Sequence, residues 1–229
     1  MNDSVFQGFS QEAVEFLWQL RFNNERSWFE PRKEEYRRLL QEPLRRLGAE
    51  VQAEVSRRHP EYPLNLHVSR IYRDSRRLHG RGPYKDHLWI VLHRPKDEAA
   101  GTVPAFYFEI APEYYSIGMG YYSATPLTMA KLRARIDRAP AEMERLARRL
   151  NRQGDFRLEG EVYRRDKGDK GELLNLWYNR KNICLCWDRP CEGTLFAREL
   201  LDEIVDGVDF LMPFYKYFAS LDAEPDPNS

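Results

Sequence analysis

The sequence predicts an α+β fold: a single domain with a largely antiparallel sheet covered by N-terminal, middle and C-terminal helices. Three observations lead to this prediction. Apolar residues follow a helical period up to about residue 58, a period of two in segments between residues 64 and 121, and a helical period again after Thr125. The links between the alternating segments are short, which favours antiparallel neighbours. Hydrophobic residues make up 42% of the 229 residues, enough for a sizeable core.

Capping residues set the limits of the predicted N-terminal helices. Ser10 is the expected N-cap of a first helix over 11–21. Ser27, three residues before Glu30, fits a capping box for the next helix. That helix is expected to continue, with a kink at Pro43, until it ends before His59-Pro60.

Alternation of apolar and polar residues predicts the strands. Four segments show it, residues 64–68, 88–92, 106–110 and 115–121, and a fifth candidate covers 183–187. The short link after residue 110 predicts a hairpin of the third and fourth strands.

The remaining chain is predicted to be helical, with an irregular stretch between. Helices are expected over 126–138 and 141–150, and a helical tail is expected to start at Thr194 and break at Pro213. Residues 151–182 are polar and are expected to be irregular, with a short hairpin around 156–163. We therefore expect one domain over residues 1–221 and a disordered tail over 222–229.

The overall composition excludes some classes of function. Lys+Arg and Asp+Glu both total 36, so the global basic field typical of non-specific DNA binding is absent. Neither a signal-like leader nor an apolar stretch of about 20 residues is evident, so no membrane partner is expected. Three clustered cysteines are an odd number, which favours a reducing compartment. A cytoplasmic protein is predicted.

Local positive charge marks residues 70–87. Six basic residues against two acidic ones give +4, so the rest of the neutral chain sums to −4. Arg70 continues the alternation of Leu66 and Val68, and an unbroken strand would turn its guanidinium towards the apolar side. A buried arginine needs a partner, which could be Asp74 or an anionic ligand.

The rest of this segment adds residue types suited to anions. Arginine makes planar, bidentate contacts with phosphate and carboxylate. The alternative is that these charges are ordinary surface residues in ion pairs worth ~0–1 kcal/mol each. The further arginines of the stretch are Arg73, Arg76, Arg77 and Arg81, and Tyr84 and Lys85 precede the next strand.

Other candidate sites give less specific signals. Asn24 and Trp28 could line a cleft, or be a polar turn and a packed ring. The cysteine and histidine spacings match no zinc pattern, so no metal is predicted. Known nucleophile and phosphate-loop motifs are absent, and no acid–base pair is forced together by spacing. Asp74 is the candidate for proton transfer, and whether the protein is an enzyme stays open.

Three sequence blocks resemble a known family. They are Asn23-Asn24 with Trp28-Phe29, Lys33 and Tyr36; Arg70-Ile71-x-Arg73-Asp74-x-Arg76 with Pro83-Tyr84-Lys85; and Gly118-x-Gly120 with Pro126, Arg133 and Ile136. Together they are similar to the bacterial and fungal family called domain of unknown function 2461. Arg77 and Arg81 depart from its pattern. The resemblance implies that the central motif recurs, and it implies no activity or cofactor.

The leading hypothesis is a protein that binds a small phosphate- or carboxylate-bearing ligand, with catalysis possible. A nucleic-acid-binding module is a second hypothesis, made less favoured by the neutral total charge. The third is a structural or partner-binding protein whose arginines form internal salt bridges. In the leading hypothesis the ligand contacts Arg70, Arg73, Arg76 and Lys85, Asp74 orients an arginine, and Trp28, Tyr84 and Asn24 complete the site.

Overall fold

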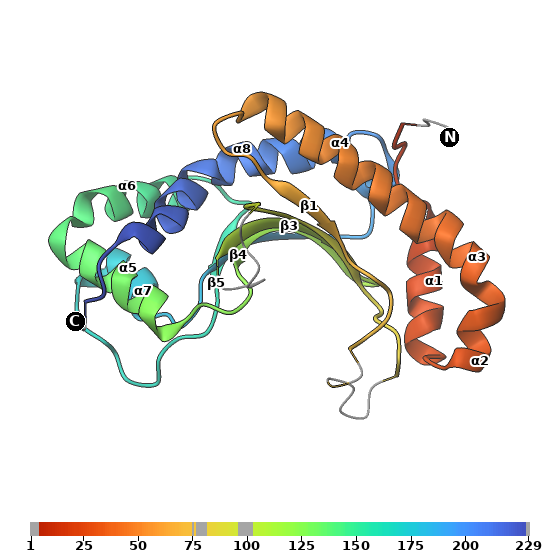
Figure 1. Ribbon diagram of the computed structural model, residues 1–229, viewed down its shortest axis with the longest axis horizontal. Coiled ribbons are helices and arrows are strands. Elements are labelled where there is room, and N and C mark those ends of the chain that lie inside the picture. The colour runs from red at the N-terminus through yellow and green to blue at the C-terminus, as the bar shows by residue number, and fades with distance from the viewer. Residues whose placement is uncertain (1–4, 75, 77–81, 96–102, 228–229) are drawn as a thin grey trace. The chain divides into compact units, whose positions relative to one another are not determined.

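The computed structural model describes residues 5–74, 76, 82–95 and 103–227 (Figure 1). It is an α+β structure with a six-stranded antiparallel sheet, which confirms the predicted fold class. The strand order is β1-β2-β3-β4-β6-β5. The strands are β1 (Asn65–Val68), β2 (Leu88–His93), β3 (Pro104–Ile110), β4 (Tyr114–Tyr121), β5 (Arg157–Glu159) and β6 (Cys184–Pro190).

The helices precede and follow the first four strands, as predicted. None of them, within the described residues, is long and apolar enough to cross a membrane. They are α1 (Gln11–Phe22), α2 (Arg26–Phe29), α3 (Lys33–Tyr36), α4 (Glu42–Arg58), α5 (Pro126–Arg138), α6 (Pro140–Asn151), α7 (Gly171–Tyr178) and α8 (Leu200–Ala219).

Contacts divide the chain into two compact units. The first contains the chain up to Pro95 with Tyr107–Ile117 and Asp188–Gly207; the second contains Gly118–Trp187, Val208 onwards and the segment that ends at Phe106. The expectation of one domain over 1–221 stays a prediction.

In the first unit, α4 covers one face of β1 and β2 (Figure 1). The strands pair antiparallel, with Leu66 opposite Leu92 and Val68 opposite Ile90. Along β2, residues 88, 90 and 92 are buried and the residues between them are only half-buried. Gly48 of α4 lets the helix approach closely, since an added Cβ would lie 3.0 Å from Leu66 and 3.2 Å from Ile90. The residues on the other face of β2 are therefore only half-buried.

In the second unit, α5, α6 and α7 pack on one another and β5 pairs antiparallel with β6. Thr125 caps α5, because its Oγ1 accepts from the Thr128 N–H at 3.0 Å. At Gly120 a side chain would collide with the Ile183 backbone, so the glycine is required for close approach of two chain segments.

Three predictions about elements are wrong. Ser27 does not cap a helix: α2 begins at Arg26, and the Ser27 hydroxyl donates to Glu25 instead. Residues 157–159 pair with β6 rather than within a local hairpin. The third is Pro213, which lies inside α8. Its neighbours Met212 and Phe214 are almost fully buried, and this burial on both sides of the proline offsets the lost hydrogen bond.

Two further regions are more ordered than predicted. Helix α7 lies in the stretch expected to be irregular, and buries Leu174 and Trp177. The expected tail begins inside a 3-10 turn, Ser220–Ala223, and the carboxylate of Glu224 pairs with Arg135 at 2.7 Å. In this salt bridge the Arg135 and Glu224 side chains are both largely buried. It therefore holds the start of the segment that was expected to be a disordered tail.

Candidate functional site

The motif segment forms an irregular hairpin between β1 and β2, within the first unit. Ser69 N–H donates to Trp89 O at 2.8 Å, and Trp89 N–H donates to Ser69 Oγ at 2.9 Å. Further from the sheet, Tyr72 and Tyr84 form an isolated antiparallel β-bridge. Between these two pairs the first strand has residues 70–71 and the second has residues 85–88. This unequal spacing breaks the regular alternation of the strand.

The break overturns the prediction for Arg70. Strand β1 ends at Val68, Ser69 is 6% exposed and Ile71 is 3% exposed, so these two residues take the inner positions. Arg70 is exposed instead of pointing towards the apolar side. The prediction for Arg70 is therefore wrong because the alternation of inward and outward residues shifts by one position at Ser69.

Asn24, just after α1, joins the N-terminal helices to the hairpin. Its side-chain amide donates to Tyr84 O and its carbonyl accepts from Tyr84 N–H, both at 2.9 Å. A side chain at Gly82 would collide with Asn24, so glycine permits this approach. The Asn24 side chain thus pairs with the backbone of Tyr84 in the way that a residue of a neighbouring strand would.

Arg73 is the internal arginine of the hairpin. Its Nε donates to Gly82 O at 3.3 Å and its Nη2 donates to Tyr84 O at 3.1 Å. The same Nη2 lies 3.9 Å from Asp86 Oδ1, and the side chain is only 15% exposed. The Arg73 guanidinium therefore faces the protein's own backbone.

Asp86 and Arg21, which the sequence reasoning missed as site residues, complete this region. Arg21 Nε donates to Asp86 Oδ2 at 2.5 Å, and His87 Nδ1 lies 3.0 Å from Oδ1. Burial opposes ionisation of Asp86, but hydrogen bonds from His87 and Arg21 hold its pKa below the ordinary value. Glu113 forms a second, bidentate pair with Arg21.

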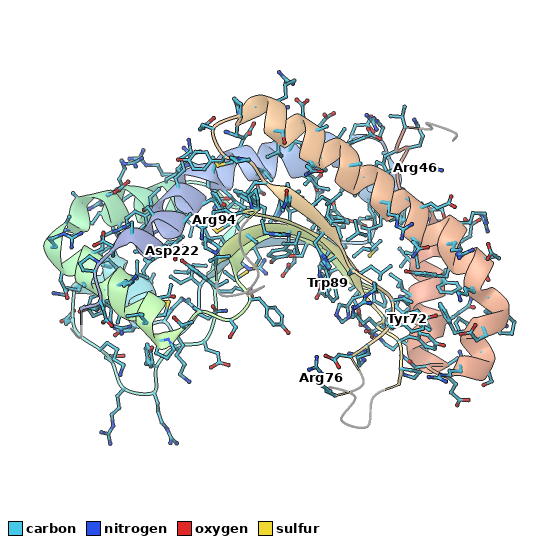
Figure 2. All side chains as sticks on the ribbon, in the orientation of Figure 1. Arg46, Tyr72, Arg76, Trp89, Arg94 and Asp222 are labelled. Carbon is cyan, nitrogen blue, oxygen red and sulfur yellow. The ribbon has the colours of Figure 1, made fainter. Side chains whose placement is uncertain are left out.

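Asp74 pairs with Arg76 at the exposed end of the hairpin. Its carboxylate accepts from the Arg76 backbone N–H at 3.0 Å, from Nε at 3.1 Å and from Nη2 at 2.8 Å. The Arg76 side chain is 87% exposed (Figure 2). Arg77 and Arg81 lie outside the described residues.

Neither predicted aromatic wall lies where the sequence suggested. Tyr84 is 1% exposed and packs on Phe29, with ring centroids 4.2 Å apart. Burial and the charge of Glu30 raise the pKa of Tyr84. Trp28 packs on Phe16 at 5.5 Å and beneath the Arg32 guanidinium. Phe29, not Trp28, is the partner of Tyr84, because consecutive helical residues point in different directions.

Lys85 and Arg70 lie together on the open side of the hairpin. The Lys85 ammonium donates to Arg70 O at 2.5 Å and lies 4.3 Å from the Trp89 ring centroid. Trp89 is on the face of β2 opposite α4 (Figure 2), and His87 stacks on it at 5.5 Å. Burial, followed by the charges of Arg70 and Arg73, lowers the pKa of Lys85.

The same surface continues to His67 on β1, which pairs with Val91 of β2. Burial lowers the pKa of His67, and the nearby charges of His93, Lys85 and Arg70 lower it further. Within the described parts of the chain, no carboxylate pairs with Arg70 or Lys85. Among the described residues this surface therefore carries two cations that are not paired with a carboxylate.

The predicted site thus divides into two clusters. The inner cluster is Asn24, Arg73, Gly82, Tyr84 and Asp86. The outer cluster is His67, Arg70, Lys85, His87 and Trp89. Asp74 and Arg76 lie at the end of the hairpin, and Trp28 belongs to neither cluster.

Comparison with known families identifies the chain. A family model described as "Conserved hypothetical protein (DUF2461)" matches residues 12–217. The chain belongs to this family. The match spans both clusters of this DUF2461 protein, and the family description names no activity. A search of curated proteins finds no match.

Proposed function

We propose that this DUF2461 protein binds a small phosphate- or carboxylate-bearing ligand at the outer cluster. One observation carries the proposal: the Lys85 ammonium is bonded to the Arg70 backbone carbonyl and feels the Arg70 charge, and neither side chain pairs with a carboxylate among the described residues, whereas Arg73 and Arg76 are engaged. An anion at this point would receive charge-assisted hydrogen bonds from both cations.

Each member of the outer cluster has a role in this proposal. The Lys85 ammonium is held by Arg70 O and the Trp89 ring, so little side-chain entropy would be lost on binding. Arg70 supplies the planar donor set, and Trp89 supplies an apolar surface for the rest of the ligand. His87, stacked on Trp89, limits how far that surface extends.

The geometry supports binding better than a particular reaction. Asp74, the predicted proton-transfer residue, already accepts from Arg76 through both oxygens and lies at the end of the hairpin. A cytoplasmic location is also part of the proposal. It is supported by the three cysteines, an odd number clustered between residues 184 and 191, which is unlike a secreted disulfide framework.

Single-stranded nucleic acid is a second candidate ligand. The observation in its favour is that an aromatic ring and two cations lie on one open strand face, the combination that stacks bases and contacts phosphates. Affinity would then rise with oligonucleotide length and fall steeply with salt, unlike the affinity for a single anion.

The test is titration calorimetry with a panel of phosphate monoesters and carboxylates. Arg70→Gln and Lys85→Gln should each weaken binding at least about tenfold, the loss of roughly one charge-assisted hydrogen bond. Arg76→Gln is the matched control, because it removes the same charge from the same hairpin outside the outer cluster. Arg73 is unsuitable for this test, since its guanidinium supports the hairpin backbone.

Two results would contradict the proposal. If no compound in the panel binds in a way that depends on Arg70, the cations have a structural role. If only oligonucleotides bind, with affinity that falls with log salt in proportion to the phosphates contacted, the nucleic-acid candidate replaces the small ligand.

A further inference from the structure

The second unit contains another pair of cations, on α5 and the loop before α7, for which no acidic partner is found among the described residues. Arg133 Cζ lies 5.5 Å from the Tyr163 ring centroid, and Lys167 Nζ lies 4.5 Å from the same centroid. One tyrosine ring thus lies within 5.5 Å of two positive charges from distant parts of the sequence. Like charges so placed repel each other unless an anion is present.

The loop that carries Tyr163 and Lys167 has a defined backbone. Tyr163 N–H donates to Asn179 O at 2.9 Å, and Lys167 N–H donates to Asn179 Oδ1 at 2.6 Å. The Asn179 amide in turn donates to Gly168 O at 3.2 Å, and Asn179 is 7% exposed. A buried asparagine therefore fixes both the aromatic ring and the cation above it.

Arg133 has an unsatisfied donor at this point. Its Nη1 is buried and has no hydrogen-bond partner among the described residues. The nearby carboxylate of Asp137 is already engaged, by the Tyr178 hydroxyl at 3.1 Å and the Lys170 ammonium at 2.7 Å. A buried charged donor without an acceptor is costly, and a bound oxyanion would remove that cost.

Lys167 is exposed, and among the described carboxylates none forms an ion pair with it. Arg164 and Arg165, also exposed, precede it in the same loop, which also contains the exposed Asp166 and Asp169. The region therefore combines a buried donor of Arg133 with the exposed ammonium of Lys167 on a loop held by Asn179.

We propose that Arg133, Lys167 and the Tyr163 ring form a second anion-binding site, suited to a phosphate group. Arg133 provides the planar donor set that matches phosphate oxygens, and Lys167 provides a point charge. The site lies in a different unit from the outer cluster and does not depend on the function proposed for it.

The test uses inorganic phosphate as the probe, at constant ionic strength maintained with chloride. Side-chain Nε–H signals of 15N-labelled arginine report on Arg133 directly, and the dependence of that signal on phosphate concentration gives the affinity of this site. Wild-type protein should show a saturable shift of the Arg133 signal, and Arg133→Gln and Lys167→Gln should each weaken phosphate binding at least about tenfold. Arg145→Gln, an exposed arginine of α6, is the charge-matched control and should bind as wild type does.

The proposal would be overturned by phosphate affinity that is the same in wild type and in Lys167→Gln, or by a linear, non-saturable shift. Lys167 is exposed, so its substitution tests the site even if Arg133→Gln does not fold. Arg70→Gln should leave this phosphate response unchanged; loss of the response in Arg70→Gln but not in Lys167→Gln would place the bound phosphate at the outer cluster instead.

Discussion

In the inner cluster of the hairpin, Arg73 and Asp86 each contact groups of opposite charge or backbone carbonyls. In the outer cluster, Arg70 and Lys85 lie together and no described carboxylate pairs with either. All four of these charged residues come from the same eighteen-residue stretch, 70–87, with an arginine in each cluster. The difference shows that residue type does not decide the role of a charge; the partners available on each side of the strand do.

This contrast predicts that the inner cluster controls the stability of the protein and the outer cluster controls ligand binding. Removing one member of a satisfied, shielded network leaves other polar groups unpaired, so the inner cluster should control folding. Arg70 is exposed and has no carboxylate partner among the described residues, so its substitution should affect stability little. The predictions below test this separation, from the largest expected effect to the smallest.

Asn24→Ala should give the largest loss of stability, about 2–4 kcal/mol, because it removes two hydrogen bonds to the Tyr84 backbone. Urea unfolding followed by circular dichroism measures the change. Asn23→Ala is the matched control: the exposed Asn23 amide contacts only Gln19 O among the described side-chain bonds, so the cost should stay under about 1 kcal/mol. Equal effects for the two variants would remove the special role given to Asn24.

Substitution of Arg73 should lower the stability of the protein much more than substitution of Arg70. Arg73→Gln should lower the free energy of unfolding by about 1.5–3 kcal/mol, the range for hydrogen bonds to a charged group. Arg70→Gln should change it by less than about 0.5 kcal/mol. The same urea titration compares them. A loss for Arg70→Gln as large as that for Arg73→Gln would mean that the outer cluster is structural too.

Asp86→Asn should make stability less dependent on acid pH. The folded-state pKa of Asp86 is lowered from 3.8, so its carboxylate stabilises the fold above that value and the contribution is lost as pH falls through the folded-state pKa. The variant should be about 1 kcal/mol less stable than wild type at pH 7, and the difference should shrink below pH ~4. Thermal unfolding at pH 7, 5 and 3 measures it; a constant difference would contradict the assignment.

Ligand binding at the outer cluster should be coupled to protonation of Lys85, the smallest effect expected. Burial and neighbouring charges lower the pKa of Lys85, so part of it is neutral at alkaline pH, and a bound anion favours the charged form. Binding near pH 9 should therefore take up a fraction of a proton. Calorimetry in buffers of different ionisation enthalpy measures the uptake, and Lys85→Gln, which cannot titrate, should abolish it.

The regular elements could be predicted because their signals are local. Ser10 caps α1 and Thr125 caps α5 through hydrogen bonds within one helical turn. The alternation in β2 follows from one face packing against α4. Helix α7 escaped prediction because eight residues, Gly171–Tyr178, give too short a sample of the helical period. Its boundaries depend on packing of Leu174 and Trp177, which are distant from their contacts in sequence.

The sequence predicted which segment holds the candidate site, but not how its side chains are oriented. The cationic stretch of residues 70–87 and the recurring motif pointed to the hairpin. The opposite orientations of Arg70 and Arg73 did not follow from the pattern, because the unequal strand lengths beyond Ser69 depend on where Tyr72 meets Tyr84. Asp86 was part of the same stretch, yet its partner Arg21 lies 65 residues away, and no local rule connects them.

The sequence by itself determined the fold class, the positions of β1 to β4 and β6, and the cationic segment 70–87 of this DUF2461 protein, because these depend on periodicity and on near neighbours. Only the tertiary structure decided which cations are neutralised. Pairing of a charge depends on the few ångströms around its terminal atoms, and those distances are set by contacts such as Asn24 with Tyr84, Arg21 with Asp86 and Arg133 with Tyr163.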